Sequence, residues 1–383
     1  MGGQVDGFVD PRFRAVRDIF EESFADGQNL GAGLTVYANT RLVVDLWGGV
    51  ADSRTGRRWE RGTPCPTFSC TKAVTATAAL QVAAKHRVDL YAPVTRWWPE
   101  YGCAGKEATT TADLLAHRAG LPAFDRPISA AEAADPAHMA GLLAAQTPVW
   151  EPGTRHGYHA QTFGWLAGEL VRRHTDSTVG DYALRYLKAG LYIGADEAVR
   201  AETARTEFPH ADQMAWDDID PIPRETADRM AAAFRDRDSL TLRATANPLG
   251  RYNDPEVLAG GWPATGLVTT SDTLARFYRT LMQGRYLHPR YRMEATAEQV
   301  RGPDEVLLSE SAFALGYMLP CENFIVPPAV PAGVFGHPGA GGALAFADPN
   351  SLLSFAFIPN LRRDWMAGDR RAYNLVESVY AAL

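Results

Sequence analysis

Segments that favour β-strands lie near both ends of this chain. Residues 33–37 and 42–47 are rich in β-branched and aromatic side chains, and a short turn-like stretch separates them as in a hairpin. Residues 343–347 and 352–358 are apolar and flank the turn sequence Asp348-Pro349-Asn350. Because the strands are confined to the two ends, we predict an α+β fold in which both chain ends build one antiparallel sheet.

Helical patterns fill the middle of the chain and also flank the predicted strands. Apolar residues recur there at helical spacing, with capping residues, glycines or prolines at the ends. The predicted helices span residues 11–26, 72–86, 112–118, 130–146, 162–174, 270–282 and 372–382. Thr111 is the expected N-cap of the third helix, and Gly120 is its expected left-handed stop. Helices should therefore flank the sheet and form a mostly helical second lobe.

The order of these segments indicates two domains. Residues 1–68 and 256–383 would form the sheet domain, and residues 69–255 the mainly helical domain, with the active site at their interface. Within the second domain, residues 195–255 are rich in charged residues and proline, so we expect an irregular, partly helical cover. Without further ligands, a solvated loop explains the three aspartates of this cover better than a metal site does: Asp217, Asp218 and Asp220.

Composition and charge narrow the classes of function. The chain has 383 residues, of which 46% are hydrophobic, and a formal net charge of −7 without a basic cluster. This balance argues against nucleic acid or an anionic membrane as the main partner. The sequence shows no signal-peptide pattern and no apolar run long enough to span a bilayer. We therefore expect a cytoplasmic protein whose cysteines are free thiols: Cys65, Cys70, Cys103 and Cys321.

One serine and one lysine stand at the spacing of a catalytic pair. Ser69 and Lys72 lie three residues apart at the start of a predicted helix, so the hydroxyl and the amine can meet on one face. The chain has four lysines against 34 arginines, and a buried lysine can lose its proton, whereas an arginine cannot. A neighbouring neutral amine can make a serine nucleophilic. Taken alone, these residues fit an N-cap serine with a solvated lysine one turn later equally well.

Motifs of several other enzyme classes are absent. The sequence contains no Gly-x-Ser-x-Gly, no His-Glu-x-x-His and no Gly-x-Gly-x-x-Gly at a strand–helix junction. These absences count against α/β-hydrolases, zinc proteases and dinucleotide-binding enzymes. We expect neither a metal nor an organic cofactor.

Five segments, in order along the chain, carry a resemblance to a known family. They are residues 68–72, 88–94, 114–122, 157–160 and 335–342. With this order and spacing the sequence resembles the serine β-lactamase and penicillin-recognising superfamily. It is most similar to the esterase branch, the family VIII carboxylesterases, which are themselves similar to class C β-lactamases. Five ordered segments are far more specific than one tetrapeptide, and they favour the catalytic interpretation of the serine–lysine pair.

The resemblance implies the catalytic roles. Ser69 matches the nucleophile and Lys72 matches its partner. Tyr158 matches the tyrosine of the family's Tyr-x-Asn motif, which hydrogen-bonds the nucleophile and acts as general base while the lysine keeps its phenol acidic. A buried core tyrosine is the alternative interpretation, but Tyr158 lies in a glycine-containing loop directly before a helix, where functional side chains are often displayed.

The resemblance also implies a substrate-binding strand and an oxyanion hole. His337 and Gly339 match positions in the family's Lys-Thr-Gly strand and would contact the substrate. The backbone amides of Ser69 and Ala340 would hold the oxyanion, because a tetrahedral intermediate needs fixed donors. Trp262 is a further candidate for substrate binding, and packing in the core explains it equally well.

Two departures from the family pattern redirect the expected substrate. The asparagine of Tyr-x-Asn is Ala160 here, and the strand lysine is His337, which we expect to be a weaker, pH-dependent cation. Both changes count against efficient β-lactam hydrolysis.

We therefore predict a serine hydrolase that acts on carboxylic esters through an acyl-enzyme at Ser69. The alternative is an acyltransferase of the same fold that passes the acyl group to an amine or alcohol. A β-lactamase and a non-catalytic binding protein are less favoured. The expected partner is a small-molecule ester or other acyl donor, with an amine or alcohol as a further partner in the acyltransferase case.

Overall fold

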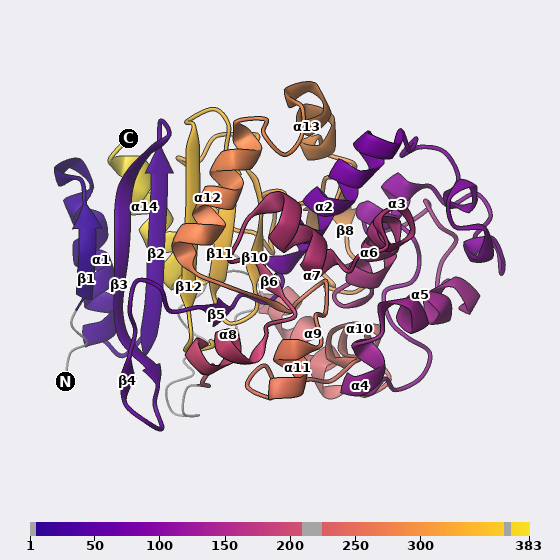
Figure 1. Cartoon of the computed structure of the whole chain (residues 1–383). Coiled ribbons are helices and arrows are strands. Elements are labelled where there is room, and N and C mark those ends of the chain that lie inside the picture. Colours follow the sequence, from indigo (N-terminus) through magenta and orange to yellow (C-terminus); the bar gives the residue numbers. More distant parts are fainter. Residues whose placement is uncertain (1–4, 209–223, 364–368) are drawn as a thin grey trace.

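The central feature of the molecule is an antiparallel sheet that the two ends of the chain build together. The structure, a computed structural model, describes residues 5–208, 224–363 and 369–383. The strand order is β1-β3-β2-β12-β11-β10, with the short β4 beside β3 (Figure 1). These strands are β1 (Val5–Val9), β2 (Gly31–Ala38), β3 (Arg41–Asp52), β4 (Arg57–Arg58), β10 (Phe335–Gly339), β11 (Ala343–Asp348) and β12 (Leu353–Pro359). Because β2 pairs antiparallel with β12, the two ends join in one sheet, which confirms the predicted fold class.

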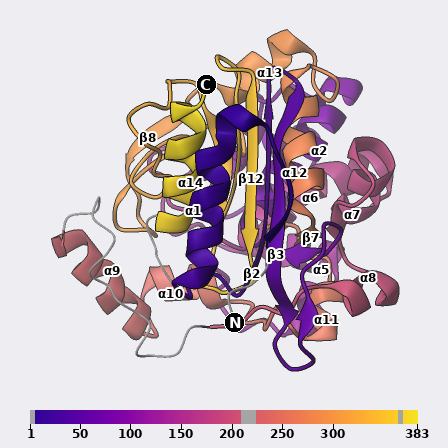
Figure 2. The ribbon, with the colours of Figure 1, turned by 90° about the vertical axis from the view of Figure 1, so that its left-hand side faces the viewer.

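Helices cover both faces of this sheet. The first helix, α1 (Arg14–Ala25), packs beside the last, α14 (Arg370–Ala381), on one face (Figure 2). On the other face α12 (Ser271–Met282) lies across β2, β11 and β12. Alternate side chains of the strands point into two different cores, one under α1 and α14 and one under α12. Both faces are thus buried, which explains why the strands of the predicted hairpin are almost wholly apolar.

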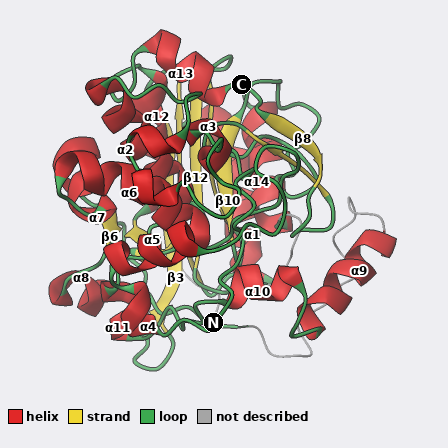
Figure 3. Ribbon diagram, turned by 90° about the vertical axis from the view of Figure 1, so that its right-hand side faces the viewer, coloured by secondary structure: helices red, strands yellow, loops and turns green. Residues whose placement is uncertain are grey.

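The second lobe is mainly helical and packs against the β10 edge of the sheet (Figure 3). Its helices are α2 (Thr71–His86), α3 (Thr111–Leu115), α4 (Ala130–Ala133), α5 (Pro136–Ala145), α6 (Thr162–Thr175), α7 (Val179–Tyr182), α8 (Glu197–Glu202), α9 (Arg224–Arg235), α10 (Leu240–Ala246) and α11 (Pro255–Ala259), with α13 (Pro289–Thr296) nearer the sheet. The described residues also include three 3-10 turns (Pro11–Phe13, Val94–Arg96 and Pro99–Tyr101) and one π-helical turn (Ala183–Leu187). The domain boundaries at residues 68 and 255 stay a prediction.

Helix α2 is the element that positions the site. Most of its residues between Thr71 and Ala83 are buried, because alanines let neighbouring elements approach closely. It packs against α6 on the side of the helical lobe, and its first turn lies against β10 of the sheet. The start of α2 is therefore held between the two lobes.

Two small groups of strands connect the lobes. One is a three-stranded sheet in the order β5-β7-β6, formed by β5 (Cys65–Pro66), β7 (Leu267–Thr269) and β6 (Tyr192–Ile193). The other is the hairpin of β8 (Val300–Pro303) and β9 (Glu310–Phe313). Strand β5 leads directly into the segment before α2, so its pairing with β7 fixes where α2 begins.

The structure differs from the expected helices at two places. The predicted helix over residues 130–146 is two helices, because Asp135 caps a new helix that starts at Pro136. The predicted N-cap Thr111 is wrong, since Thr110 forms the capping box with Asp113. That helix ends at Leu115, and His117 adopts a left-handed conformation with φ 60°.

Further outcomes concern one strand, the cysteines, the aspartate cluster and membrane-spanning helices. Strand β1 was not expected from the sequence; it pairs with β3 at the outer edge of the sheet. The four cysteines are free, as predicted. The three aspartates of the 195–255 cover lie outside the described residues: Asp217, Asp218 and Asp220. Among the described residues, no helix has the length and apolarity needed to cross a membrane.

Candidate active site

The candidate nucleophile Ser69 lies in a tight turn immediately before α2. Phe68, the residue before it, has φ 50°, a left-handed conformation that is uncommon for an aromatic residue. Backbone bonds close the turn, from Thr71 N to Phe68 O (2.9 Å) and from Lys72 N to Ser69 O (3.0 Å). The N-cap of α2 is Cys70, so Ser69 is not an N-cap serine and its hydroxyl has other partners.

Ser69 Oγ has two functional groups as neighbours. The phenol of Tyr158 donates a hydrogen bond to Ser69 Oγ (2.8 Å), and Lys72 Nζ lies 3.3 Å from the same oxygen. The lysine comes from one turn later on α2, as its spacing predicts. Tyr158 comes from the loop just before α6, far away in the sequence, so the serine–lysine spacing alone could not place it beside Ser69. The structure thus brings together the three side chains for which catalytic roles were predicted.

The Lys72 amine is completely buried. Besides Ser69 it contacts two backbone carbonyls, Ala160 O at 2.7 Å and Ala264 O at 3.2 Å. Burial disfavours the charged form, and it lowers the pKa of Lys72 well below 10.5. The lysine is therefore suited to be a neutral amine at the start of a reaction. Ala160 stands where the family's Tyr-x-Asn motif has asparagine, and its backbone carbonyl accepts a hydrogen bond from Lys72.

Tyr158 is surrounded by aromatic rings and neutral imidazoles. Its ring stacks on Phe313, and the rings of His117 and His337 lie 5.2 and 5.8 Å away. Burial, more than any neighbouring charge, raises the pKa of the Tyr158 phenol. The expectation that Lys72 keeps this phenol acidic is therefore not met, since a neutral amine does not stabilise a phenolate.

Strand β10 lies directly beside the nucleophile turn. Cys70 Sγ donates a hydrogen bond to His337 O (3.2 Å). A Cβ atom on Gly339 would stand 2.3 Å from Thr67 O, so only glycine lets the strand approach the turn this closely. Ala340, the next residue, is exposed, and neither its amide nor the amide of Ser69 has an acceptor among the described residues. Two free donors therefore stand where an oxyanion hole is predicted.

His337 is buried and neutral, which corrects the expectation of a pH-dependent cation. Burial lowers its pKa to about 3, so the imidazole carries no charge at neutral pH. Its Nδ1 contacts Pro338 O at 2.7 Å and must carry the proton there, while Nε2 has no partner within the part of the chain that the structure describes. The position that holds a lysine in the family pattern thus presents an uncharged acceptor.

Comparison with known proteins agrees with this geometry. The model of the family described as Beta-lactamase matches residues 16–379. This chain belongs to the β-lactamase family. A relative from Mycobacterium tuberculosis, named esterase/beta-lactamase LipL, is 31% identical over 375 residues, which cover 94% of this chain and 83% of that protein.

Solved structures of the β-lactamase family superpose on nearly the whole chain. A family VIII carboxylesterase is 29% identical with a TM-score of 0.87, covering 99% of this chain and 100% of that one. A penicillin-binding protein homologue from Caulobacter crescentus is 34% identical with a TM-score of 0.85, again covering 99% and 100%. The resemblance inferred from five sequence segments therefore extends to the full fold.

Trp262, a candidate substrate-binding residue from the sequence, lies in the protein core rather than at the site of this β-lactamase-family protein. It is only 1% exposed and packs in the core of the helical lobe, where its ring meets Tyr252. Of the two interpretations left open by the sequence, the structure favours packing. The nearest link of Trp262 to the site is through Tyr252, which also contacts Phe68 beside Ser69.

Sequence reasoning missed one residue next to Tyr158. Asp304, in the turn between β8 and β9, accepts the backbone N–H of Tyr158 at 3.0 Å. The two residues are 146 positions apart, so no local pattern could join them. The one available signal was an aspartate directly after a proline in a short hairpin, which is typical of turn capping.

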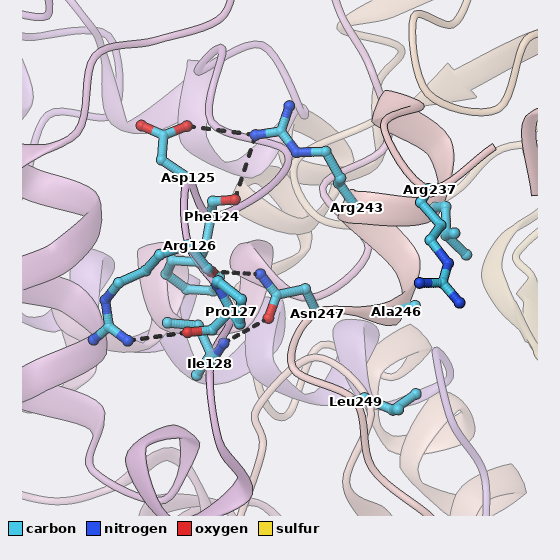
Figure 4. Close-up of a pocket in the computed structure, with 11 residues that line it drawn as sticks. Phe124, Asp125, Arg126, Pro127, Ile128, Arg237, Arg243, Ala246, Asn247 and Leu249 are labelled. Atoms are coloured by element: carbon cyan, nitrogen blue, oxygen red, sulfur yellow. Dashed lines mark hydrogen bonds and ion pairs between the residues drawn. The ribbon is translucent and has the colours of Figure 1, made fainter.

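A separate surface hollow of about 360 Å³ lies where the loop after Phe124 meets α10 (Figure 4). Asn247 accepts from Ile128 N (2.9 Å) and donates to Arg126 O (2.8 Å), which ties the two sides together. The lining includes none of the three predicted catalytic residues. In this member of the β-lactamase family the hollow is therefore distinct from the nucleophile turn.

Proposed function

We propose that this protein is a serine esterase that cleaves carboxylic esters through an acyl-enzyme at Ser69. The best support is the pair of contacts at one atom, because Ser69 Oγ faces both the Lys72 amine and the Tyr158 phenol. The names of similar proteins agree, since they include an esterase/beta-lactamase and a family VIII carboxylesterase. Comparable serine–amine pairs activate hydroxyl nucleophiles.

In this proposal Lys72 is the base that accepts the Ser69 proton. A neutral amine has two N–H groups and one lone pair. The two carbonyls that face Lys72 Nζ, Ala160 O and Ala264 O, take the two N–H groups, and the lone pair is left for the Ser69 hydroxyl. Tyr158 already donates its own proton to Ser69 Oγ, so it is placed as an acid rather than as a base.

The acylation step then follows from these positions. Ser69 Oγ bonds to the ester carbonyl carbon as its proton moves to Lys72. The backbone amides of Ser69 and Ala340 hold the oxyanion. When the C–O bond of the leaving alcohol breaks, the alkoxide takes the proton of Tyr158, which regains one from the Lys72 ammonium. Water attacks the acyl-enzyme by the same proton path and releases the acid.

The site favours an uncharged ester. His337 presents a neutral acceptor, because its pKa is about 3, where the family pattern has a cation for an anionic substrate group. Ala160 lacks the side-chain amide expected to hold the acylamino group of a β-lactam. We propose that the strand carrying His337 and Gly339 borders the ester next to its carbonyl, with the buried Nε2 of His337 lying behind that surface. The same features disfavour β-lactams as substrates.

Acyl transfer to an amine or alcohol remains the second candidate, because it uses the same acyl-enzyme with a different attacking group. EstCE1, whose structure is described as a hydrolase with promiscuous acyltransferase activity, superposes with a TM-score of 0.68. At 17% identity this likeness shows the fold alone. The rate at which added amines or alcohols capture the acyl group, relative to water, decides between the two.

Covalent labelling tests the proposed function. Wild-type protein should form one adduct with a reactive phosphonate or an activated ester, which mass spectrometry locates on Ser69. Ser69→Ala should form none. Tyr158→Phe should lower kcat for alkyl esters by about 10²–10⁴-fold, the usual contribution of a proton-transfer group. A folded wild-type protein that forms no adduct would overturn the proposal.

A further inference from the structure

Asp304 occupies an unusual position for a residue that caps its own turn. It is only 3% exposed and stands at the start of the turn that joins β8 and β9. Its Oδ1 accepts the backbone N–H groups of Val306 and Leu307, each at 2.8 Å. Those two bonds cap the turn. Asp304 accepts two more hydrogen bonds, one at Oδ1 and one at Oδ2, that turn capping does not require.

The remaining bonds of Asp304 reach the loop that carries Tyr158. Oδ1 accepts the Tyr158 N–H at 3.0 Å, and Oδ2 accepts the Ser311 hydroxyl at 2.7 Å. Ser311 Oγ in turn lies 3.0 Å from His156 Nε2. One buried carboxylate thus holds the Tyr158 loop at two points, directly at Tyr158 and through Ser311 at His156.

The backbone between these two points is also fixed. Gly157 N donates to His117 O at 3.1 Å, and Glu305 N donates to His156 O at 3.2 Å. A Cβ on Gly157 would stand 2.8 Å from the Trp150 ring, so the loop has no room to shift in that direction. The phenol lies at the end of a side chain that begins at this loop. A small displacement of the Tyr158 backbone would therefore move the hydroxyl away from Ser69 Oγ.

We propose that Asp304 is a positioning residue that holds the Tyr158 phenol in hydrogen-bond reach of Ser69. This inference rests on the proposed function, in which Tyr158 donates its proton to the leaving alcohol. Asp304 touches neither Ser69 nor Lys72 in the structure, so its effect passes through Tyr158 alone. The β8–β9 turn thereby becomes part of the catalytic apparatus, although it supplies no reacting group.

Shape, more than negative charge, is what this role requires. An asparagine at 304 keeps one oxygen for the three backbone donors, and its amide can donate to Ser311. Ser311 would then donate to His156, which is able to accept because burial lowers its pKa and keeps the ring neutral. Asp304→Asn should therefore retain most of the wild-type kcat/KM, whereas Asp304→Ala should not.

The matched control is a second aspartate with the same local task. Asp348 caps the turn between β11 and β12, where Oδ1 accepts from Asn350 N at 2.9 Å and Oδ2 accepts from the Tyr380 hydroxyl at 2.8 Å. It is fully buried, and its hydrogen bonds go to Asn350, Ser351 and Tyr380, none of which lies in the Tyr158 loop. Asp348→Ala should lower the melting temperature and leave kcat/KM unchanged.

Steady-state kinetics with two esters of one acid tests the proposal. With an ethyl ester, Asp304→Ala should lower kcat/KM, which reports the acylation step, by about 10- to 100-fold, the cost of a misplaced catalytic group. With a p-nitrophenyl ester the loss should be much smaller, because that leaving group departs without a proton. In a Tyr158→Phe background, Asp304→Ala should have no further effect. If Asp304→Ala does not fold, Ser311→Ala should give a smaller loss with the same leaving-group pattern.

Two results would overturn the positioning role. One is an equal loss with both esters. The other is an undiminished loss in the Tyr158→Phe background, because a general loosening of the fold would still act there. Failure of the proposed function is recognised separately, since wild-type protein would then form no adduct at Ser69.

Discussion

At the scale of single residues, burial decides the chemistry of the site. Lys72 Nζ is enclosed, and its pKa is lowered because the protein interior solvates a charge poorly. The same effect keeps His337 neutral. In the proposed mechanism Lys72 is a base and His337 a neutral acceptor, and neither resembles the surface cation that its residue type suggests. A pH-dependent experiment can detect both shifts.

The shifted pKa of Lys72 predicts a pH-dependent cost to stability. At pH values between the lowered pKa of the folded state and 10.5, the unfolded chain holds a proton on Lys72 that the folded protein lacks. The unfolded state binds more protons, so the free energy of unfolding rises with pH, by about 1.4 kcal/mol per pH unit for one group. Lys72→Met removes this contribution. The free energy of unfolding of wild type should therefore rise relative to that of Lys72→Met as pH rises towards 10.5.

Denaturant unfolding of both proteins at two pH values just below 10.5 measures this difference. Lys188→Met, at a lysine in a partly exposed linker, is the control and should match wild type in its pH slope. Identical slopes for Lys72→Met and wild type would mean that Lys72 is protonated in the folded protein.

The pH–rate profile should carry no contribution from His337. Its pKa of about 3 means that the imidazole stays neutral as pH falls from 8 to about 5. His337→Gln keeps a neutral hydrogen-bonding side chain, so kcat/KM for an uncharged ester should have the same pH dependence in both proteins. A limb with a midpoint near 6.5 that disappears in His337→Gln would contradict the buried, neutral state.

At the scale of elements, the site is the meeting point of the α2 start, the Tyr158 loop and β10. Local sequence accounts for each of these pieces separately. The alanine-rich helix begins close to where its pattern predicts, and β11 and β12 form near their predicted bounds. The approach of β10 to the nucleophile turn depends on a missing side chain, at Gly339.

Gly339→Ala should weaken that approach. The added Cβ would meet Thr67 O at 2.3 Å, and backbone on both sides would have to move. We expect a loss of about 1–3 kcal/mol in stability from overpacking. We also expect a lower kcat, because the Ala340 amide would shift relative to Ser69. Thermal unfolding and ester hydrolysis measure the two effects.

Gly62→Ala is the matched control, since nothing lies within 4 Å of a Cβ at that position. It should change neither stability nor kcat appreciably. Full activity in Gly339→Ala would show that the oxyanion hole does not depend on the close packing of β10 against residue 67.

At the scale of the whole molecule, the sheet depends on residues from both ends of the chain. Strand β2 is central only because β12 pairs with it, and α1 is covered by α14. A chain that ends at residue 334 lacks β10, β11, β12 and α14. It would leave the long apolar edge of β2 unpaired, which favours aggregation over folding.

This truncated chain should therefore show no cooperative thermal unfolding transition. Circular dichroism on heating, compared with the full chain, measures the outcome. A sharp transition near the wild-type melting temperature would mean that the N-terminal part folds without the C-terminal strands.

The sequence by itself determined most local elements and the spacing of Ser69 and Lys72, because helical and strand periodicity and i,i+3 spacing are local properties. The sheet built from both ends was inferred from where the strand patterns lie along the chain. The sequence did not determine the helix break at Pro136 or strand β1, whose formation depends on pairing with β3. Local patterns therefore predict most elements. The predictions fail where a capping residue splits a helix or where a strand forms only by pairing with a distant one.

Only the tertiary structure decided the protonation of Lys72 and His337, the burial of Trp262 and the contact between Asp304 and Tyr158. Burial is the sum of what all other elements exclude, so no window of sequence contains it. The Asp304 contact joins positions 146 residues apart, through a hairpin and a loop that meet only in the folded protein. The chemistry of the site thus depends on packing between the lobes, while its predicted nucleophile is indicated by five ordered segments of the sequence.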